Sequence, residues 1–193
     1  MSAIVPPGLP ALTEDDRRQL LDIARQAVAA HLAANPFALP EVLAPGLRQG
    51  GAAFVTLRRR GDGELRGCIG TLDAHEEPLA AVVARMAVAA ATHDPRFSPV
   101  TAAEMPSIVV EVSVLTPPSP IDPAAVTPGL HGLVVRHAGR SGLLLPQVAT
   151  EHGWDRETFL DWTCRKAGLP PGAWKEPEAS VLGFTAVVFS EEL

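Results

Sequence analysis

Strand-like and helix-like segments alternate along this chain, and prolines and glycines separate them. Apolar residues at 3.6-residue spacing predict helices, and short β-branched runs bounded by turn residues predict strands. The expected helices cover residues 13–34, 79–91 and about 155–168, and the expected strands cover 52–57, 64–72, 107–115, 131–136, 142–145 and 181–189. Antiparallel-looking strands interleaved with helices indicate an α+β fold, with antiparallel sheets flanked by helices.

Turn and cap residues predict where several elements begin and end. Residues 13–16 (TEDD) resemble a capping box, with Asp16 in the place of the usual Glu or Gln, so the first helix should start there. Residues 58–63 (RRRGDG) supply the turn of a hairpin between the first two strands. Pro78 suits the first position of the second helix. Residues 116–129 contain five prolines and are expected to be a loop.

The composition is that of an ordinary globular protein, with 193 residues and a net charge of −6. We expect a Pro-rich lead over residues 1–12 and a single domain over 13–193. The acidic balance makes nucleic acid an unlikely partner. No apolar run reaches the roughly 18 residues of a membrane span. The lead also lacks the basic region of a signal peptide, so a cytoplasmic location is expected.

The segment LRGCIG at 65–70 carries the strongest indication of chemistry. Glycine inside a strand marks a bulge or a close backbone approach, and Gly67 and Gly70 flank Cys68. On a regular strand Arg66 would face the same side as Cys68, where its charge would lower the thiol pKa and favour the thiolate. The alternative is that Cys68 is a buried small hydrophobe next to packing glycines.

A cysteine nucleophile also needs a base, and His131 and His93 are the candidates among the six histidines. Cys164 lies on the predicted last helix in a context typical of packing. Two cysteines so far apart in a reducing compartment are expected to be free thiols, although sequence separation leaves a disulfide between them open.

No motif predicts a metal or a cofactor. The chain has no pair of histidines at i, i+4 and no CxxC. It also lacks a P-loop and a dinucleotide fingerprint. The run Arg58–Arg60 is typical of a solvated turn, and no neighbouring aromatic residue offers a base a stacking surface.

The LRGCIG segment resembles the hallmark of the AMMECR domain family, and further matches follow in the family's order. They are FVTL at 54–57, LRGCIGTL at 65–72, DPRF at 94–97, EVSVL at 111–115, HG at 131–132, LLPQVA at 144–149, WD at 154–155, FL at 159–160 and CRKAGLP at 164–170. The resemblance covers about residues 13–190, nearly the whole chain.

This resemblance implies a compact two-lobed α+β fold with a cleft near the RGCIG segment. Stand-alone members resemble a component of the AmmeMemoRadiSam system, which implies a Memo-like protein and a radical S-adenosylmethionine protein as partners. The family has no established activity, so the resemblance implies partners and no reaction. The site residues that it transfers are Arg66, Gly67, Cys68, Gly70, Asp94, Arg96 and His131.

Two hypotheses follow, and the first is slightly favoured. The chain is a thiol-dependent enzyme component, with Cys68 as nucleophile or radical carrier, Arg66 as thiolate or anion partner and His131 as base. Substrate binding would then fall to the remaining transferred residues, namely Gly67, Gly70, Asp94 and Arg96. Alternatively, it is a non-catalytic binding or adaptor module whose cleft docks a protein, a small molecule or a nucleic acid.

Several of the transferred residues also fit structural roles. Asp94 before a proline fits a cap at the helix–loop junction, and Arg96 fits an ion pair with it. His131 fits a structural histidine at the start of a strand.

Overall fold

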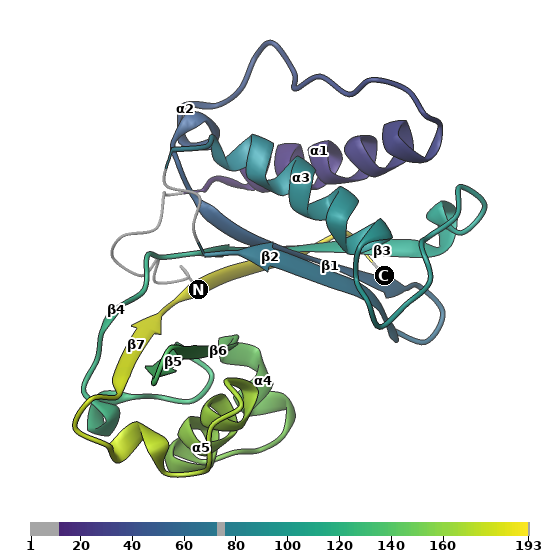
Figure 1. Ribbon diagram of the computed structural model, residues 1–193. Coiled ribbons are helices and arrows are strands. Elements are labelled where there is room, and N and C mark those ends of the chain that lie inside the picture. Colours follow the sequence, from purple (N-terminus) through teal and green to yellow (C-terminus); the bar gives the residue numbers. More distant parts are fainter. Residues whose placement is uncertain (1–11, 73–75, 193) are drawn as a thin grey trace. The chain divides into compact units, whose positions relative to one another are not determined.

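The computed structural model describes residues 12–72 and 76–192, which form two compact units (Figure 1). Of the described residues, the first unit contains 12–72, 76–115 and 187–192, and the second contains 116–186. The predicted Pro-rich lead lies outside the described residues except for Leu12, which is buried in the core of the first unit. A single domain over residues 13–193 stays a prediction. Within the described ranges, no helix is long and apolar enough to cross a membrane.

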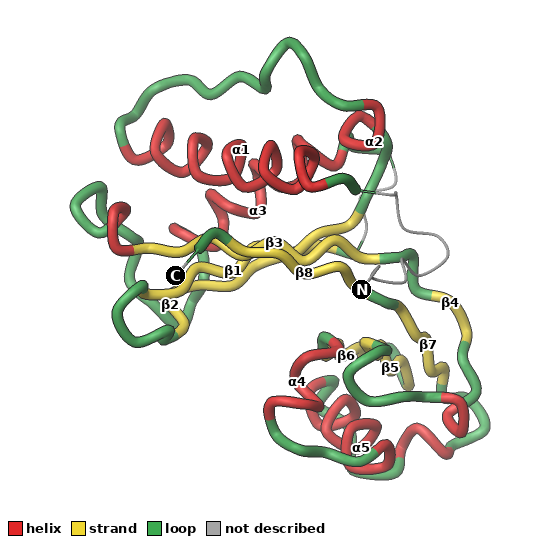
Figure 2. Tube along the Cα trace, turned by 180° about the vertical axis from the view of Figure 1, so that it is seen from behind, coloured by secondary structure: helices red, strands yellow, loops and turns green. Residues whose placement is uncertain are grey.

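The first unit is a four-stranded sheet in the order β2-β1-β3-β8, with helices on one face (Figures 1 and 2). Strand β1 pairs antiparallel with both β2 and β3, and β2 is an edge strand. The strands are β1 (Ala52–Arg59), β2 (Leu65–Thr71), β3 (Ile108–Leu115) and β8 (Ala186–Ser190). The helices are α1 (Glu14–Leu32), α2 (Pro45–Arg48), α3 (Leu79–Thr92) and the 3-10 turn η1 (Met105–Ser107).

The helices form where their caps and apolar faces predict them. The predicted capping box is present: Asp16 N–H donates to Thr13 Oγ1 at 3.2 Å, and Thr13 N–H donates to Asp16 Oδ2 at 2.8 Å. Helix α3 begins one residue after Pro78, which is its N-cap and not its first helical residue. The core between the helices and the sheet is made of fully buried side chains, among them Leu20, Ile23, Val55, Leu79, Val82, Val110 and Val112.

The second unit is a four-stranded sheet in the order β4-β7-β5-β6. Its strands are β4 (Ser119–Pro120), β5 (Gly132–His137), β6 (Arg140–Leu144) and β7 (Ser180–Phe184). Its helices are α4 (Pro146–Glu151), α5 (Arg156–Lys166) and the 3-10 turns η2 (Pro123–Ala125) and η3 (Ala173–Lys175). Phe159, Leu160 and Cys164 of α5 are fully buried in a separate core with Leu133 and Val135 of β5.

The final strand is not continuous, contrary to the prediction for residues 181–189. The chain leaves the second sheet after β7, passes Thr185 and enters the first sheet as β8. At this switch Thr116 N–H donates to the Thr185 carbonyl at 2.9 Å, and Thr185 N–H donates to Thr116 Oγ1 at 2.8 Å. Apolar residues lie on both sides of Thr185, so the sequence carries no clear break where the chain changes sheets.

The proline-rich stretch 116–129 is also less irregular than predicted. It contains the two-residue strand β4, which pairs antiparallel with β7. Because β4 is an edge strand, Pro120 can occupy it without breaking a central ladder.

Candidate functional site

Both glycines of the RGCIG segment mark close approaches, as the sequence predicts. A methyl group at Gly67 would overlap the backbone carbonyl of Ala90 in α3. A methyl group at Gly70 would overlap the ring of Phe54, its partner across the β1–β2 ladder. The glycines therefore bring α3 close to one face of β2 and an aromatic ring against the other.

A bulge in β2 redirects Arg66. Leu57 lies opposite Gly67 while Arg58 lies opposite Leu65, so Arg66 is an extra residue in the register. Bulges bend a strand and re-aim the side chain at the extra position. The expectation that Arg66 faces Cys68, which assumes a regular strand, is therefore wrong.

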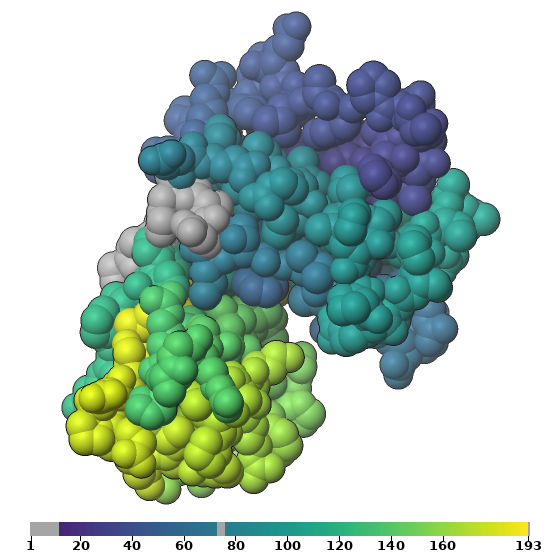
Figure 3. Space-filling model, viewed as in Figure 1, coloured from purple at the N-terminus to yellow at the C-terminus, as the bar shows by residue number. Residues whose placement is uncertain are grey.

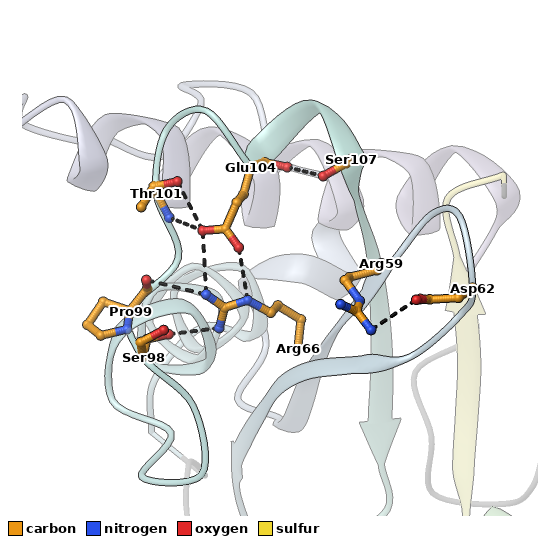
Figure 4. A network of polar contacts seen from close by, with 8 residues as sticks. All are labelled: Arg59, Asp62, Arg66, Ser98, Pro99, Thr101, Glu104 and Ser107. Carbon is orange, nitrogen blue, oxygen red and sulfur yellow. Dashed lines mark hydrogen bonds and ion pairs between the residues drawn. The ribbon is translucent and has the colours of Figure 1, made fainter.

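Arg66 instead holds the loop that follows α3 (Figure 4). Its guanidinium pairs with both carboxylate oxygens of Glu104, at 3.1 and 3.4 Å, and donates to the carbonyl oxygens of Ser98 (2.7 Å) and Pro99 (3.4 Å). Glu104 also accepts from the backbone N–H of Thr101 at 2.8 Å, and these bonds lower the pKa of its carboxyl group. Only 12% of the Arg66 side chain is exposed, so this arginine is a structural clamp.

Asp94 provides a hydrogen-bond acceptor for the edge strand β2 at Cys68. Its Oδ2 accepts the backbone N–H of Cys68 at 2.8 Å, so a side chain replaces the neighbouring strand that this edge lacks. Because that N–H points away from β1, Cys68 and Thr56 form a non-hydrogen-bonded pair, in which facing side chains lie closest. The Thr56 hydroxyl accordingly donates to Cys68 Sγ at 3.4 Å.

Arg96 satisfies the rest of the Asp94 carboxylate. Its backbone N–H and its Nε donate to Oδ1 at 3.1 and 2.9 Å, and Nη2 donates to Oδ2 at 2.7 Å. These bonds, together with that of Cys68, hold the pKa of the Asp94 carboxyl well below its usual range. Only 3% of the Asp94 side chain is exposed, whereas Arg96 is 53% exposed. The carboxylate is therefore an ionised structural latch.

The surroundings of Cys68 favour its neutral thiol over the thiolate. Burial raises its pKa above the ordinary value and outweighs the hydrogen bond from Thr56 and the charge of Arg96, which lower it. The charges of Asp94 and Glu111 raise it further. The expectation of a thiolate stabilised by Arg66 is thus overturned, because Arg66 is bound by Glu104 and burial disfavours the charged sulfur.

This gives a direct expectation for alkylation. Cys68 is half-buried, so it should react in the folded protein with an apparent pKa above the usual value of about 8.5. Cys164 is fully buried in the second unit and should stay unreactive until the protein unfolds. Iodoacetamide labelling across pH 6–11, with each cysteine followed separately by mass spectrometry, measures both. An apparent pKa for Cys68 clearly below 8.5 would contradict the protonated thiol.

His131 belongs to the second unit, whereas Arg66, Gly67, Cys68, Gly70, Asp94 and Arg96 all belong to the first. Its Nδ1 accepts the backbone N–H of Thr127 at 3.0 Å, and burial lowers the pKa of its imidazole. In the neutral ring the proton must then lie on Nε2, so His131 is a donor at that nitrogen. Its assignment as a base stays a prediction.

The second unit carries a surface feature that the motif analysis missed. The rings of His152, Trp154 and Trp162 are stacked, with centroids 4.6 and 5.2 Å apart, and the Arg165 guanidinium lies 4.8 Å from the Trp162 ring. Trp162 is 42% exposed. We call these four residues the aromatic stack. Its sequence signal is Trp162 and Arg165 at i, i+3 on the predicted last helix, on one helical face.

Both cysteines are free thiols, as predicted. Among the described residues, no group of three or more His, Cys, Asp or Glu side chains is placed to hold a metal ion.

Known proteins are similar to this one over nearly its whole length. The AMMECR1 family model matches residues 21–189. A protein of Methanothermobacter thermautotrophicus is 46% identical over 189 residues, which cover 94% of this chain and 97% of that protein. Protein MK0488 of Methanopyrus kandleri is 41% identical over 189 residues, covering 94% and 91%. The crystal structure of the uncharacterized protein PH0010 from Pyrococcus horikoshii is similar with a TM-score of 0.88 and 41% identity, over 94% of each chain.

Proposed function

The chain belongs to the AMMECR1 family, and we propose that it acts as a non-catalytic binding module that docks a partner protein. One observation carries this choice over the nucleophile hypothesis. The charged residues of the family pattern around Cys68 are engaged in ion pairs, Arg66 with Glu104 and Asp94 with Arg96, and these pairs hold the backbone together. A cysteine nucleophile needs a thiolate or a base that forms one, and the groups of these two pairs are already bound to each other.

The aromatic stack supplies the docking surface of this proposal. Trp and Arg are the residue types that dominate binding energy at protein interfaces, and Trp162 is already partly exposed. The three rings of the stack are ordered before a partner binds, because each ring lies against the next. Less side-chain entropy is therefore lost on binding.

The partners in this proposal are the Memo-like protein and the radical S-adenosylmethionine protein that the family resemblance implies. That resemblance supports both partners. We also propose a cytoplasmic location for the protein.

Cys68→Ala and Trp162→Ala separate docking from chemistry. With either partner, Cys68→Ala should bind within about twofold of the parent chain, and it should leave the reconstituted three-protein reaction intact. Trp162→Ala should weaken binding about 30-fold, corresponding to the roughly 2 kcal/mol of an interface hot spot. Isothermal titration calorimetry measures both affinities. Val42→Ala is the matched control, because Val42 is 80% exposed and lies in the other unit. Unchanged binding by Trp162→Ala would remove the stack from the proposal.

A second candidate function is a thiol-dependent component in which Cys68 carries a radical. The half-buried, protonated thiol favours it, because hydrogen-atom transfer uses an S–H bond and not a thiolate. The carbon radical of the partner would take the hydrogen atom of Cys68 Sγ, and the thiyl radical would recover one from a C–H bond of the substrate. Loss of the reconstituted reaction in both Cys68→Ser and Cys68→Ala, with partner binding retained, would establish this candidate and refute the non-catalytic module.

A further inference from the structure

A pocket of about 520 Å³ lies within the first unit between α1, α3 and the loop that follows α1. In Figure 3, atoms of α1 (purple) lie between those of this loop (blue) and those of α3 (teal). The volume falls in the range of roughly 300–1,000 Å³ that small-molecule sites occupy. The pocket is formed by one unit only, and none of the residues transferred from the family pattern lines it.

Small side chains on facing helices account for the pocket. Ala27 of α1 and Ala81, Ala84 and Ala89 of α3 lie where larger residues would fill the space between the helices. Phe37 and Leu39 of the loop, with Val88 of α3, add apolar surface to the lining. A pocket with such a lining can hold the apolar part of a ligand, because burying that surface removes it from water.

The ionisable groups of the lining are all basic. They are His31, Arg85 and His93, joined by the neutral amide of Asn35, and the lining contains no carboxylate although the whole chain has a net charge of −6. Arg85 also pairs with Glu77 outside the lining, through Nε at 3.3 Å and Nη2 at 2.5 Å. That pair offsets part of its charge and leaves the imidazoles as the main partners for a ligand head group.

The hydrogen bonds of His93 determine what its ring can offer. The Thr92 hydroxyl donates to the Val88 carbonyl at 2.7 Å, so its oxygen is the acceptor in the 2.6 Å contact with His93 Nδ1. Nδ1 therefore carries a proton, and Nε2 is the nitrogen left for a ligand. In the imidazolium form Nε2–H also donates, so a carboxylate at this nitrogen accepts a charge-assisted hydrogen bond.

We infer that this pocket binds a small amphipathic carboxylate, with its apolar body against the alanines and its head group at His93 and Arg85. The inference goes beyond partner docking and does not involve Cys68 or the aromatic stack.

Three probes with the same chain and different head groups test the site: octanoate, octanol and octyltrimethylammonium. Calorimetric titration of the full chain should show saturable binding of octanoate, about tenfold weaker binding of octanol and no binding of the cation. Equal binding of all three, or no saturable binding of octanoate, would overturn the inference.

Two variants locate the binding. Ala81→Leu should fill the pocket and abolish octanoate binding, with the thermal unfolding midpoint as the check on folding. His93→Gln changes an exposed side chain and should weaken octanoate about tenfold while leaving octanol unchanged. His137→Gln, in the other unit and outside the pocket, is its control. Undiminished octanoate binding by His93→Gln would refute the head-group assignment. The effect of Trp162→Ala on partner binding does not depend on the octanoate results.

Discussion

Gly67→Ala should destabilise the first unit by about 3 kcal/mol, as is typical when a side chain is forced into a packed backbone contact. The added methyl group would overlap the Ala90 carbonyl of α3. A backbone oxygen inside a helix cannot rotate away, so α3 and β2 have to move apart. Urea unfolding at pH 7 measures the change.

Gly61→Ala is the matched control for this variant. Gly61 lies in the turn between β1 and β2, where an added methyl group would meet nothing within 4 Å. Its effect should stay within about 0.5 kcal/mol, as for most surface substitutions. Equal stability of the two variants would show that α3 does not approach β2 as closely as described.

The Gly67→Ala variant has a second expected result at Cys68. Asp94 follows α3 by two residues, so moving α3 away from β2 also pulls its carboxylate from the Cys68 N–H. The thiol should then be alkylated faster at a given pH than in the parent chain. The rate for Cys164, in the other unit, should stay unchanged.

Asp94→Asn should cost about 2–3 kcal/mol of stability, because it removes the charge from a buried carboxylate that holds four donors. Solvent screening at the exposed Arg96 keeps the loss below that of a fully buried pair. Asp15→Asn is the matched control, since Asp15 forms an ion pair with Arg18 in which the side chains are 90% and 71% exposed. That variant should change stability by no more than about 0.5 kcal/mol.

The pH dependence of the unfolding free energy distinguishes the loss of the Asp94 charge from a change in side-chain packing. The pKa of Asp94 is held below its usual range in the folded protein, whereas the unfolded chain takes up a proton at about pH 3.9. The stabilisation from the ionised carboxylate is therefore present above about pH 4 and is lost as the pH falls further. Asp94→Asn lacks it, so the difference in unfolding free energy between parent and variant should shrink between pH 5 and pH 3. A difference that stays constant over this range would contradict the role of the charge.

Local pattern predicted the elements and part of the site. The capping box at Thr13, the hairpin at residues 52–72 and the start of the last helix near residue 155 depend on residues close together in the sequence. The close approach at Gly67 was also predictable, because glycine in a strand loses packing and is favoured where another backbone comes near.

The surroundings of Cys68 were not predictable in the same way. Asp94 lies 26 residues from Cys68 and Glu104 lies 38 residues from Arg66, so only the folded chain brings these groups together. One bulge then reverses the expected role of Arg66, since a shift of a single residue re-aims a side chain. The division of residues 181–189 between two sheets has the same origin, because extended backbone looks alike in either sheet.

The sequence by itself determined the α+β class, the positions of most helices and strands, and the family, because hydrophobic spacing, caps and ordered motifs are local properties of the chain. Tertiary structure alone decided that burial raises the pKa of the Cys68 thiol and that Arg66 and Asp94 bind protein groups. Burial and the pairing of charges depend on which distant segments meet, and they determine both the pKa of a thiol and the partner of an arginine.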